Sequence, residues 1–346
     1  MKLGITRRNG VADISITIFP APKELPVPES FPLTLMVVVD AEEEFDWNAP
    51  FDPHSVGVSN IARQPRAQAI LDEHGIRPTY MVDYPVAVTG QSRDVLGEIA
   101  ASNRCDIGAH LHPWVTPPHE GPVDERTSYP GNLPPKLERA KLEVLTEAIE
   151  AGFGQRPVMY RAGRYGIGAA TMTALGALGY RVDSSVVPFT DFSAGEGPDF
   201  TAFGETPFMI SDRMVEMPLS VGFAGVLAGS GPRLYPMLGT GVAQRFRLHG
   251  VAARSGMLER LRLSPEGHTL ADMIRQTVAA KARGTRLFMV TYHSSSLLPG
   301  GTPYARDEAA CRALLRTLAG YCSYFMGPLG GQPGTLMGSA AALAGW

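Results

Sequence analysis

Residues 33–39, Leu-Thr-Leu-Met-Val-Val-Val, form a nearly continuous apolar run, and five carboxylates follow within the next seven residues. An apolar run rich in β-branched residues is typical of a strand covered on both faces, as in parallel sheets and barrels. Such folds build their active sites at the carboxyl ends of the strands. The acidic run is therefore either part of a site or a solvated loop. Its members are Asp40, Glu42, Glu43, Glu44 and Asp46.

Strand-like and helix-like patterns alternate after residue 33. Repeated units of this length indicate parallel strands joined by right-handed crossovers, and they predict a closed or nearly closed α/β barrel. Further strands are expected at 79–82, 105–110, 158–160, 180–183 and 286–292. Helices are expected at 59–74, 95–102, 133–152, 169–178, 269–283 and 306–325.

The regular pattern defines the expected domain boundaries. Residues 31–325 are predicted to form the barrel, preceded by an extension, 1–30, with a short strand near 14–18 and a proline-rich linker. The alternation lapses at about 188–266, which is interpreted as an insertion or lid over the barrel mouth. Residues 326–346 are expected to be a glycine-rich tail.

Composition excludes several classes of partner. The chain has 346 residues, a net charge of -3 and a pI near 6.3, which argues against nucleic acid or an anionic membrane as the main partner. The three cysteines have unrelated spacings and indicate neither a disulfide framework nor a thiolate metal site. No signal peptide and no spanning run of about 18 apolar residues is recognisable. A cytoplasmic protein is expected, and its oligomeric state is left open.

Two histidines at the end of the third expected strand favour a metal site. His110 and His112 are two residues apart, so in extended chain they point the same way, as do Asp40 and Glu42 on the first strand. Two imidazoles and one carboxylate match a catalytic zinc site, which keeps one position open for water or substrate. A divalent ion, with zinc preferred, is therefore predicted.

The remaining strand ends supply further polar groups. Arg161 and Arg164 emerge from an apolar strand and need anionic partners there. Asp183 ends the next strand, and His293 ends the last one. A metal, a spare carboxylate, a guanidinium and a separate histidine are the groups needed for hydrolysis by an activated water.

In their order, these motifs resemble those of the NodB-like polysaccharide deacetylases, carbohydrate esterase family 4, and most closely the WalW-like branch associated with lipopolysaccharide biosynthesis. The resemblance covers about residues 33–300 and implies a distorted barrel of about seven parallel strands. It lies in VVVDAEEEFDW (37–47), DIGAHLHPW (106–114), YRAGRYG (160–166), YRVDSSVVP (180–188) and TYHSSSLLPG (291–300).

The resemblance also implies catalytic roles. Asp40 would be the base, Arg161 would clamp it, Asp183 would tune the catalytic histidine, and His293 would be the general acid.

For the metal, the resemblance implies one carboxylate and two histidines. Ala41 occupies the usual position of the metal carboxylate, so the ligand is expected to be Glu42, with Glu43 as second choice. Trp114 stands at the usual second histidine, which leaves His110 and His112 as the pair.

Substrate contacts are expected from aromatic residues and one arginine. Arg164 occupies the position of a usual tyrosine, and Tyr165 follows it. Trp47, Trp114 and Tyr165 are predicted to form the apolar walls around a sugar ring.

The function favoured by the sequence is metal-dependent removal of N-acetyl groups from a sugar, polysaccharide or lipopolysaccharide precursor. One alternative is a related amidohydrolase that acts on a non-sugar C–N bond. Another is a degenerate barrel that binds glycan without chemistry, because fold alone does not settle activity.

Overall fold

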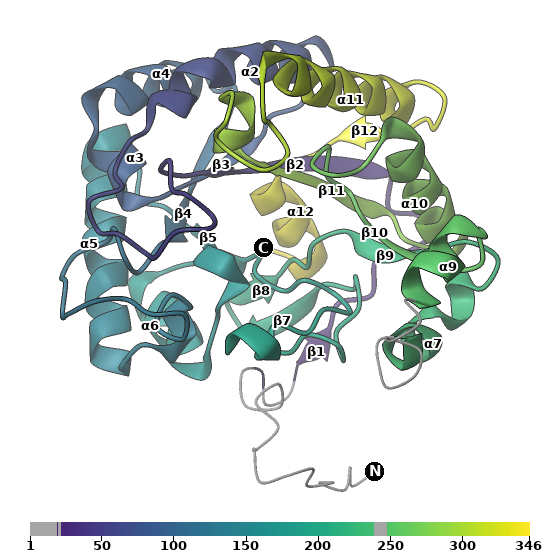
Figure 1. Cartoon of the computed structure of the whole chain (residues 1–346), viewed down its shortest axis with the longest axis horizontal. Helices are drawn as coiled ribbons and strands as arrows, with labels where there is room; N and C mark the ends of the chain where they lie inside the picture. The colour runs from purple at the N-terminus through teal and green to yellow at the C-terminus, as the bar shows by residue number, and fades with distance from the viewer. Residues whose placement is uncertain (1–18, 20–21, 239–247) are drawn as a thin grey trace, which may run out of the picture.

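The polypeptide is built around one mostly parallel sheet of ten strands (Figure 1). This computed structural model describes residue 19 and residues 22–238 and 248–346; the strand expected near 14–18 lies outside them. Along the sheet the order is β1 (Lys23–Glu24), β7 (Phe208–Ser211), β8 (Met214–Glu216), β6 (Val182–Asp183), β5 (Met159–Ala162), β4 (Asp106–Leu111), β3 (Thr79–Val82), β2 (Thr34–Ala41) and β11 (Leu287–His293). β12 (Gln332–Pro333) pairs with β2.

In the order of the sheet, the seven neighbouring strands from β8 through β6, β5, β4, β3 and β2 to β11 are all parallel. The predicted α/β barrel is therefore confirmed. The opening apolar run forms β2, and all eight of its residues are buried. Its register places Asp40 beside His293 on β11, while His110 on β4 lies beside Arg161 on β5. Parallel pairing thus brings the polar groups of distant segments to one rim.

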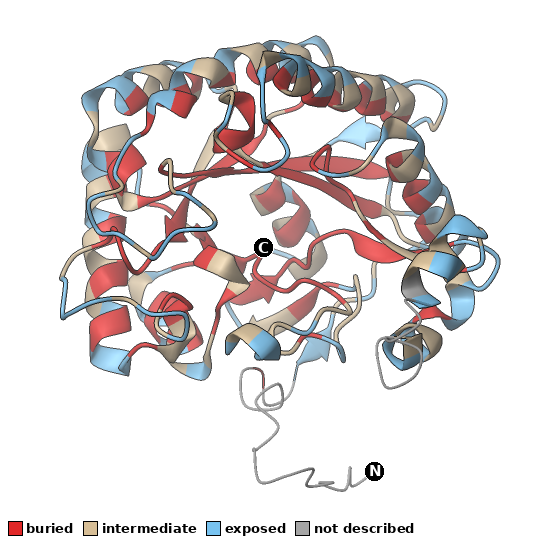
Figure 2. Ribbon diagram, in the orientation of Figure 1, coloured by how far each residue is buried: buried red, intermediate tan, exposed pale blue. Residues whose placement is uncertain are grey.

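Helices surround the strands as an outer layer, and their buried faces turn toward the sheet (Figures 1 and 2). Apolar positions at helical spacing explain this arrangement, because each helix buries one stripe against the strands. The longest helix before the lid region, α5, ends at Gly154, whose φ of 71° is the left-handed stop that glycine tolerates. The layer comprises α2 (Gln64–Glu73), α3 (Tyr84–Val88), α4 (Gly90–Ala101), α5 (Pro135–Phe153), α6 (Ala169–Leu178), α10 (Leu270–Ala282) and α11 (Glu308–Met326).

The stretch interpreted as an insertion is partly barrel wall. β7 and β8 belong to the central sheet, and β8 is the parallel neighbour of β6. A three-residue strand carries too short a pattern to be recognised in sequence. The rest forms an antiparallel pair, β9 (Val221–Ala224) and β10 (Glu259–Arg262), with α7 (Gly231–Leu238) and α9 (Leu248–Arg254) between them. The backbone N–H of Leu263 donates to Ser220, and that of Thr291 to Leu263, which ties this pair to β11.

The expected C-terminal tail is an ordered part of the barrel. β12 pairs with the first residues of β2, and α12 (Leu336–Ala344) follows it. Leu336 and Ala340 are buried in the main core, and the guanidinium of Arg181, just before β6, lies 4.0 Å from the centre of the Trp346 ring. α12 therefore covers the amino ends of the strands, opposite the rim that carries the polar groups.

Short 3-10 helices connect several elements: η1 (Ser59–Arg63), η2 (Pro130–Asn132), η3 (Gly163–Tyr165), η4 (Ser193–Gly195), η5 (Ala228–Ser230) and η6 (Ser294–Leu297). Among the helices that the structure describes, none combines the length and the hydropathy needed to cross a membrane.

Candidate active site

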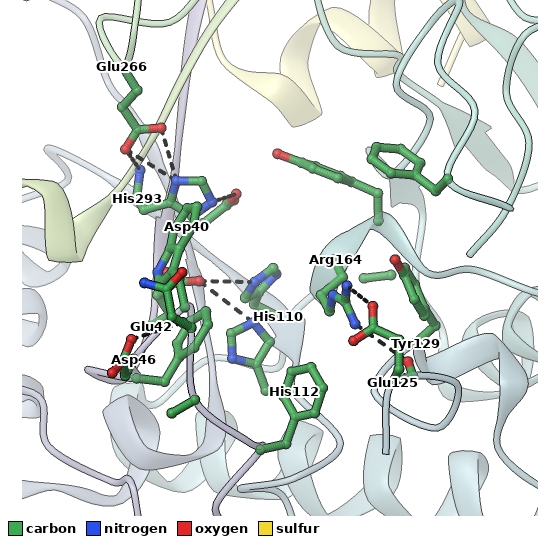
Figure 3. Close-up of a pocket in the computed structure, with 18 of the residues that line it drawn as sticks. Asp40, Glu42, Asp46, His110, His112, Glu125, Tyr129, Arg164, Glu266 and His293 are labelled. Carbon is green, nitrogen blue, oxygen red and sulfur yellow. Dashed lines mark hydrogen bonds and ion pairs between the residues drawn. The ribbon is translucent and has the colours of Figure 1, made fainter. Parts of the chain in front are cut away.

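A cavity of about 740 Å³ opens at the carboxyl ends of the parallel strands (Figure 3). Asp40 comes from β2, His110 from β4 and His293 from β11, and all three line it. Arg161 lies on β5, next to its last residue, and is fully buried. The structure thus brings together the polar strand ends that the sequence singles out.

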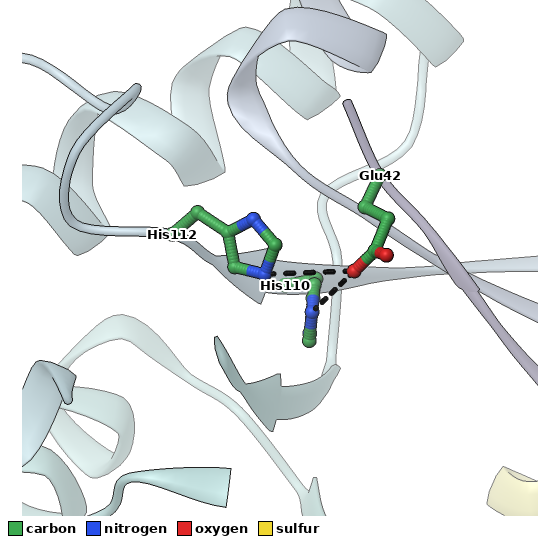
Figure 4. A group of neighbouring side chains, drawn as sticks. All are labelled: Glu42, His110 and His112. Carbon is green, nitrogen blue, oxygen red and sulfur yellow. Dashed lines mark ion pairs between the residues drawn. The ribbon is translucent and has the colours of Figure 1, made fainter. Parts of the chain in front are cut away.

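Glu42, His110 and His112 form a buried group whose ligand atoms all lie within 4.8 Å of one another (Figure 4). The Nε2 atoms of both histidines lie 3.6 Å from Oε2 of Glu42. Two imidazole nitrogens and one carboxylate oxygen converging in this way are a donor set suited to a divalent metal such as zinc. The three predicted ligands could therefore hold an ion together.

Both histidines are oriented through their other ring nitrogen. Nδ1 of His110 lies 3.0 Å from the carbonyl oxygen of Arg161, and Nδ1 of His112 lies 2.7 Å from Oε2 of Glu43. These oxygens accept the Nδ1 proton, so the lone pair of each Nε2 faces the centre of the group, as metal ligands require. Gly163 packs so closely that an added Cβ would lie 2.5 Å from Cδ2 of His112.

Glu43, the second-choice ligand, lies behind the histidines instead. Besides His112, it accepts a 2.6 Å hydrogen bond from Nε1 of Trp114, and its backbone N–H donates to Asp83. Burial raises the pKa of Glu43 to about 7. Glu43, Asp83 and His112 are also close enough to form a cation site, but the Nδ1 contact makes Glu43 a support for His112.

The prediction that Trp114 forms a wall of the sugar site has to be corrected. Its side chain is 1% exposed and stacks on the His112 ring at 4.2 Å between centres, so it does not line the cavity. The period-two rule fails here because β4 ends at Leu111, and the chain beyond it no longer alternates as a strand. Trp114 positions Glu43 and His112 rather than a ligand.

Asp40 is held by an arginine, as predicted. Nη1 of Arg161 donates to Oδ1 of Asp40 at 2.7 Å, and its other nitrogens donate to Ser184. Burial by itself would raise the pKa of Asp40, but the Arg161 charge and the neighbouring His110 and His293 outweigh it and lower the pKa to about 2. Asp40 is therefore an ionised carboxylate in a buried position.

His293 has a carboxylate partner that sequence reasoning missed. Oε2 of Glu266 lies 2.9 Å from Nδ1 of His293, and Oε1 of Glu266 accepts the backbone N–H of the same residue. On the other side, Nε2 of His293 lies 3.9 Å from Oδ2 of Asp40. Burial opposes protonation, but Glu266 and the nearby Glu42 raise the pKa of His293 well above its ordinary value. In the sequence, this partner of His293 is indicated only by the presence of an acidic residue in the loop before α10.

Asp183 does not tune the histidine, and this prediction is wrong. Its side chain is buried, accepts a hydrogen bond from Ser185 and lies beside Glu216 on the neighbouring strand. Burial raises the pKa of both Asp183 and Glu216, and the charge of Asp183 raises that of Glu216 further. Two adjacent buried carboxyl groups do not readily both ionise, so this pair favours a state in which one of them is protonated.

The other expected substrate contacts do line the cavity. Trp47 packs edge-on to the His293 ring at 5.1 Å, and its Nε1 is buried without a hydrogen-bond partner among the described residues. Arg164 donates to Glu125 at 2.6 Å and lies 4.2 Å above the Tyr129 ring.

Arg164 and Tyr165 also share a strained backbone. Both have left-handed φ values, 53° and 61°, which are uncommon for residues other than glycine.

Structural comparison identifies the fold. One similar structure is a proposed polysaccharide deacetylase from Mycobacterium smegmatis, with a TM-score of 0.51, 20% identity and coverage of 88% of this chain and 89% of that one. The chain has the fold of a polysaccharide deacetylase. A proposed glycoside hydrolase/deacetylase from Parabacteroides distasonis shares this fold, with a TM-score of 0.54, 10% identity and coverage of 92% and 72%. No protein-family model and no curated protein sequence matches the chain.

Proposed function

We propose that the chain is a metal-dependent hydrolase that removes N-acetyl groups from a sugar or from a polysaccharide or lipopolysaccharide precursor. The observation that carries this proposal is the Glu42–His110–His112 group with Asp40 and His293 beside it in one cavity. The deacetylase fold agrees with it but does not by itself assign an activity.

The metal proposed for the triad is Zn²⁺, because two histidines and one carboxylate are its usual catalytic ligands. When bound there, such an ion would polarise the acetamide carbonyl and acidify the attacking water. Glu43 and Trp114 would keep the His112 ring in place for it.

Asp40 is the proposed base. Its Oδ1 is occupied by Arg161, which leaves Oδ2 to accept a proton from water as the water oxygen adds to the carbonyl carbon. The guanidinium of Arg161 keeps the carboxylate ionised and fixes its orientation.

His293 is the proposed acid. Glu266 accepts the Nδ1 proton and stabilises the imidazolium, so that Nε2 can donate its proton to the departing nitrogen. The C–N bond breaks as the nitrogen takes up this proton, and acetate and the amino sugar are released. Trp47 and Tyr165 would provide the apolar walls for the sugar.

The decisive experiment combines metal analysis with acetate release. Purified protein should contain about one divalent ion per chain, and N-acetylated glycans should release acetate in its presence. Chelation should abolish this activity, and added Zn²⁺ should restore it. Glycan binding without acetate release would favour the non-catalytic barrel, and release from non-sugar amides alone would favour the other amidohydrolase. The WalW-like branch and a cytoplasmic location stay predictions.

A further inference from the structure

Arg262, at the end of β10, is a cation in the active cavity without an anionic partner among the described residues. It lines the cavity together with Asp40 and Glu266. Its Nη2 donates to the hydroxyl of Tyr165, and this is the only hydrogen bond that its guanidinium makes within the described part of the chain. Its Nε is buried and has no acceptor there. Most of the five donors of this side chain are therefore unused.

Arg161 and Arg164, which also lie at this rim, each have a carboxylate partner. Arg161 contacts Asp40, and all three of its nitrogens have acceptors. Arg164 is paired with Glu125 and also donates to Ser128. A partly desolvated guanidinium without such acceptors is costly, which indicates that Arg262 has an acceptor that the chain itself does not supply.

Two carboxylates that line the cavity, Asp40 and Glu266, stabilise the charge of Arg262 from a distance. Neither of them, nor any other carboxylate of the described residues, lies within 4.0 Å of the Arg262 nitrogens. The remaining N–H donors of Arg262 are therefore available to an anionic group that enters the cavity.

We propose that Arg262 binds an anionic group of the substrate, a carboxylate or a phosphate, so that the cavity selects acidic N-acetylated sugars over neutral ones. A planar guanidinium suits both groups, because its parallel N–H donors match two anionic oxygens. The Tyr165 hydroxyl fixes the side chain from one side and leaves the remaining donors available. The identity of the substrate as an N-acetylated sugar rests on the proposed function, whereas anion binding does not.

Calorimetric titration of the metal-loaded protein with three ligands provides the first test. These are N-acetylglucosamine, its 6-phosphate and the corresponding N-acetylated uronic acid. The wild type should bind at least one acidic sugar roughly tenfold or more tightly than the neutral one. The acidic sugar that gains affinity distinguishes phosphate from carboxylate recognition. Equal affinity for all three would overturn the proposal.

Arg262→Gln should abolish this preference while keeping the metal content and thermal unfolding midpoint of the wild type. Arg262→Lys keeps the positive charge but loses the parallel N–H donors of the guanidinium, so it should keep only part of the preference. Arg275→Gln is the matched control, because it removes one exposed positive charge away from the cavity. An anion preference that survives Arg262→Gln would mean that the metal or another group binds the anion, and it would refute this assignment.

Acetate release from the same sugars separates the two proposals. If binding depends on Arg262 but no sugar is hydrolysed, anion recognition stands and the hydrolase proposal fails. If Arg262→Gln lowers kcat/KM equally for neutral and acidic sugars, Arg262 acts on the reaction centre and the specificity proposal fails.

Discussion

Glu266 and His293 form a largely buried ion pair in which Oε2 of the carboxylate lies 2.9 Å from Nδ1 of the imidazole. The same carboxylate accepts the backbone N–H of His293 and a 2.5 Å hydrogen bond from Ser296. These contacts fix which histidine nitrogen faces Asp40 and keep the ring in its charged form. The candidate acid is therefore supported from a loop, not from a strand of the barrel.

Replacing Glu266 with Gln should lower the pKa of His293, because the neutral amide no longer stabilises the imidazolium. Activity that needs protonated His293 would then be lost at a lower pH, and the alkaline limb of the pH–rate profile should move toward acid. The pKa of His293 can be measured directly by NMR titration of its ring protons.

Asp183→Asn is the control for this shift, since Asp183 contacts Ser185 and Glu216 but not His293. It should leave the His293 titration unchanged. A shift in Asp183→Asn equal to that in Glu266→Gln would contradict the assignment of Glu266 as the partner.

The same ion pair has a consequence for stability. The folded-state pKa of His293 lies above its unfolded value of about 6.5, so protonated His293 binds its proton more tightly when folded. The stabilisation is fully present below pH 6.5 and is lost as the pH rises toward the folded-state pKa. Glu266→Gln should reduce this pH dependence in denaturant unfolding measured on either side of that value.

His110→Ala should lose the divalent ion, because it removes one of three protein ligands. Metal content per chain, measured by mass spectrometry after dialysis, checks this. His119→Ala is a matched control, since His119 is exposed and lies outside the group. Equal metal content in both variants would rule out the proposed site.

Asp40→Asn should keep the metal but lower the rate of acetate release by roughly 10²- to 10⁴-fold, as expected for loss of a general base. The variant also leaves Arg161 without its buried anion, so thermal unfolding has to be measured alongside. Asp52→Asn, which changes an exposed carboxylate, serves as control. Full activity in a folded Asp40→Asn protein would exclude Asp40 as the base.

Trp114→Phe should weaken metal affinity by roughly ten- to a hundredfold, because it removes the donor that fixes Glu43 behind His112. Trp47→Phe should instead raise the KM for sugar and leave metal affinity unchanged, since Trp47 lines the cavity. Competition with a chromogenic chelator measures the first effect, and steady-state kinetics the second. The reverse pattern would restore Trp114 as a substrate contact.

Leu336→Ala should reduce the free energy of unfolding by about 2–5 kcal/mol, the usual cost of such a cavity in a core. Leu336 is 1% exposed on α12, within the segment that the sequence suggests to be a tail. Leu248→Ala, at a position that is 37% exposed, should cost much less. Equal values in denaturant unfolding would show that α12 does not contribute to the core.

The central strands and their rim could be predicted because the signal is local. A continuous apolar run followed by polar residues marks both a buried strand and its end, as at Val39 and Asp40. Parallel pairing then brings such ends together whatever the intervening chain does, which is why Asp40, His110 and His293 meet.

Short strands and loops could not be placed in this way. β8 has three residues, and Glu266 lies in a loop whose position depends on backbone hydrogen bonds between Leu263, Ser220 and Thr291. No periodic pattern encodes such contacts. The same limit explains why Trp114 was expected in the cavity although it is buried behind His112.

By itself, the sequence determined the barrel class and the residue types available at its rim, because strand periodicity and strand ends are properties of neighbouring residues. Only the tertiary structure decided which carboxylate serves which partner: Glu42 among the metal donors, Glu43 behind His112 and Glu266 behind His293. These assignments depend on distances between segments that are far apart in the chain. A shift of about an ångström in packing decides whether a carboxylate reaches the metal group or instead accepts a hydrogen bond from a histidine behind it.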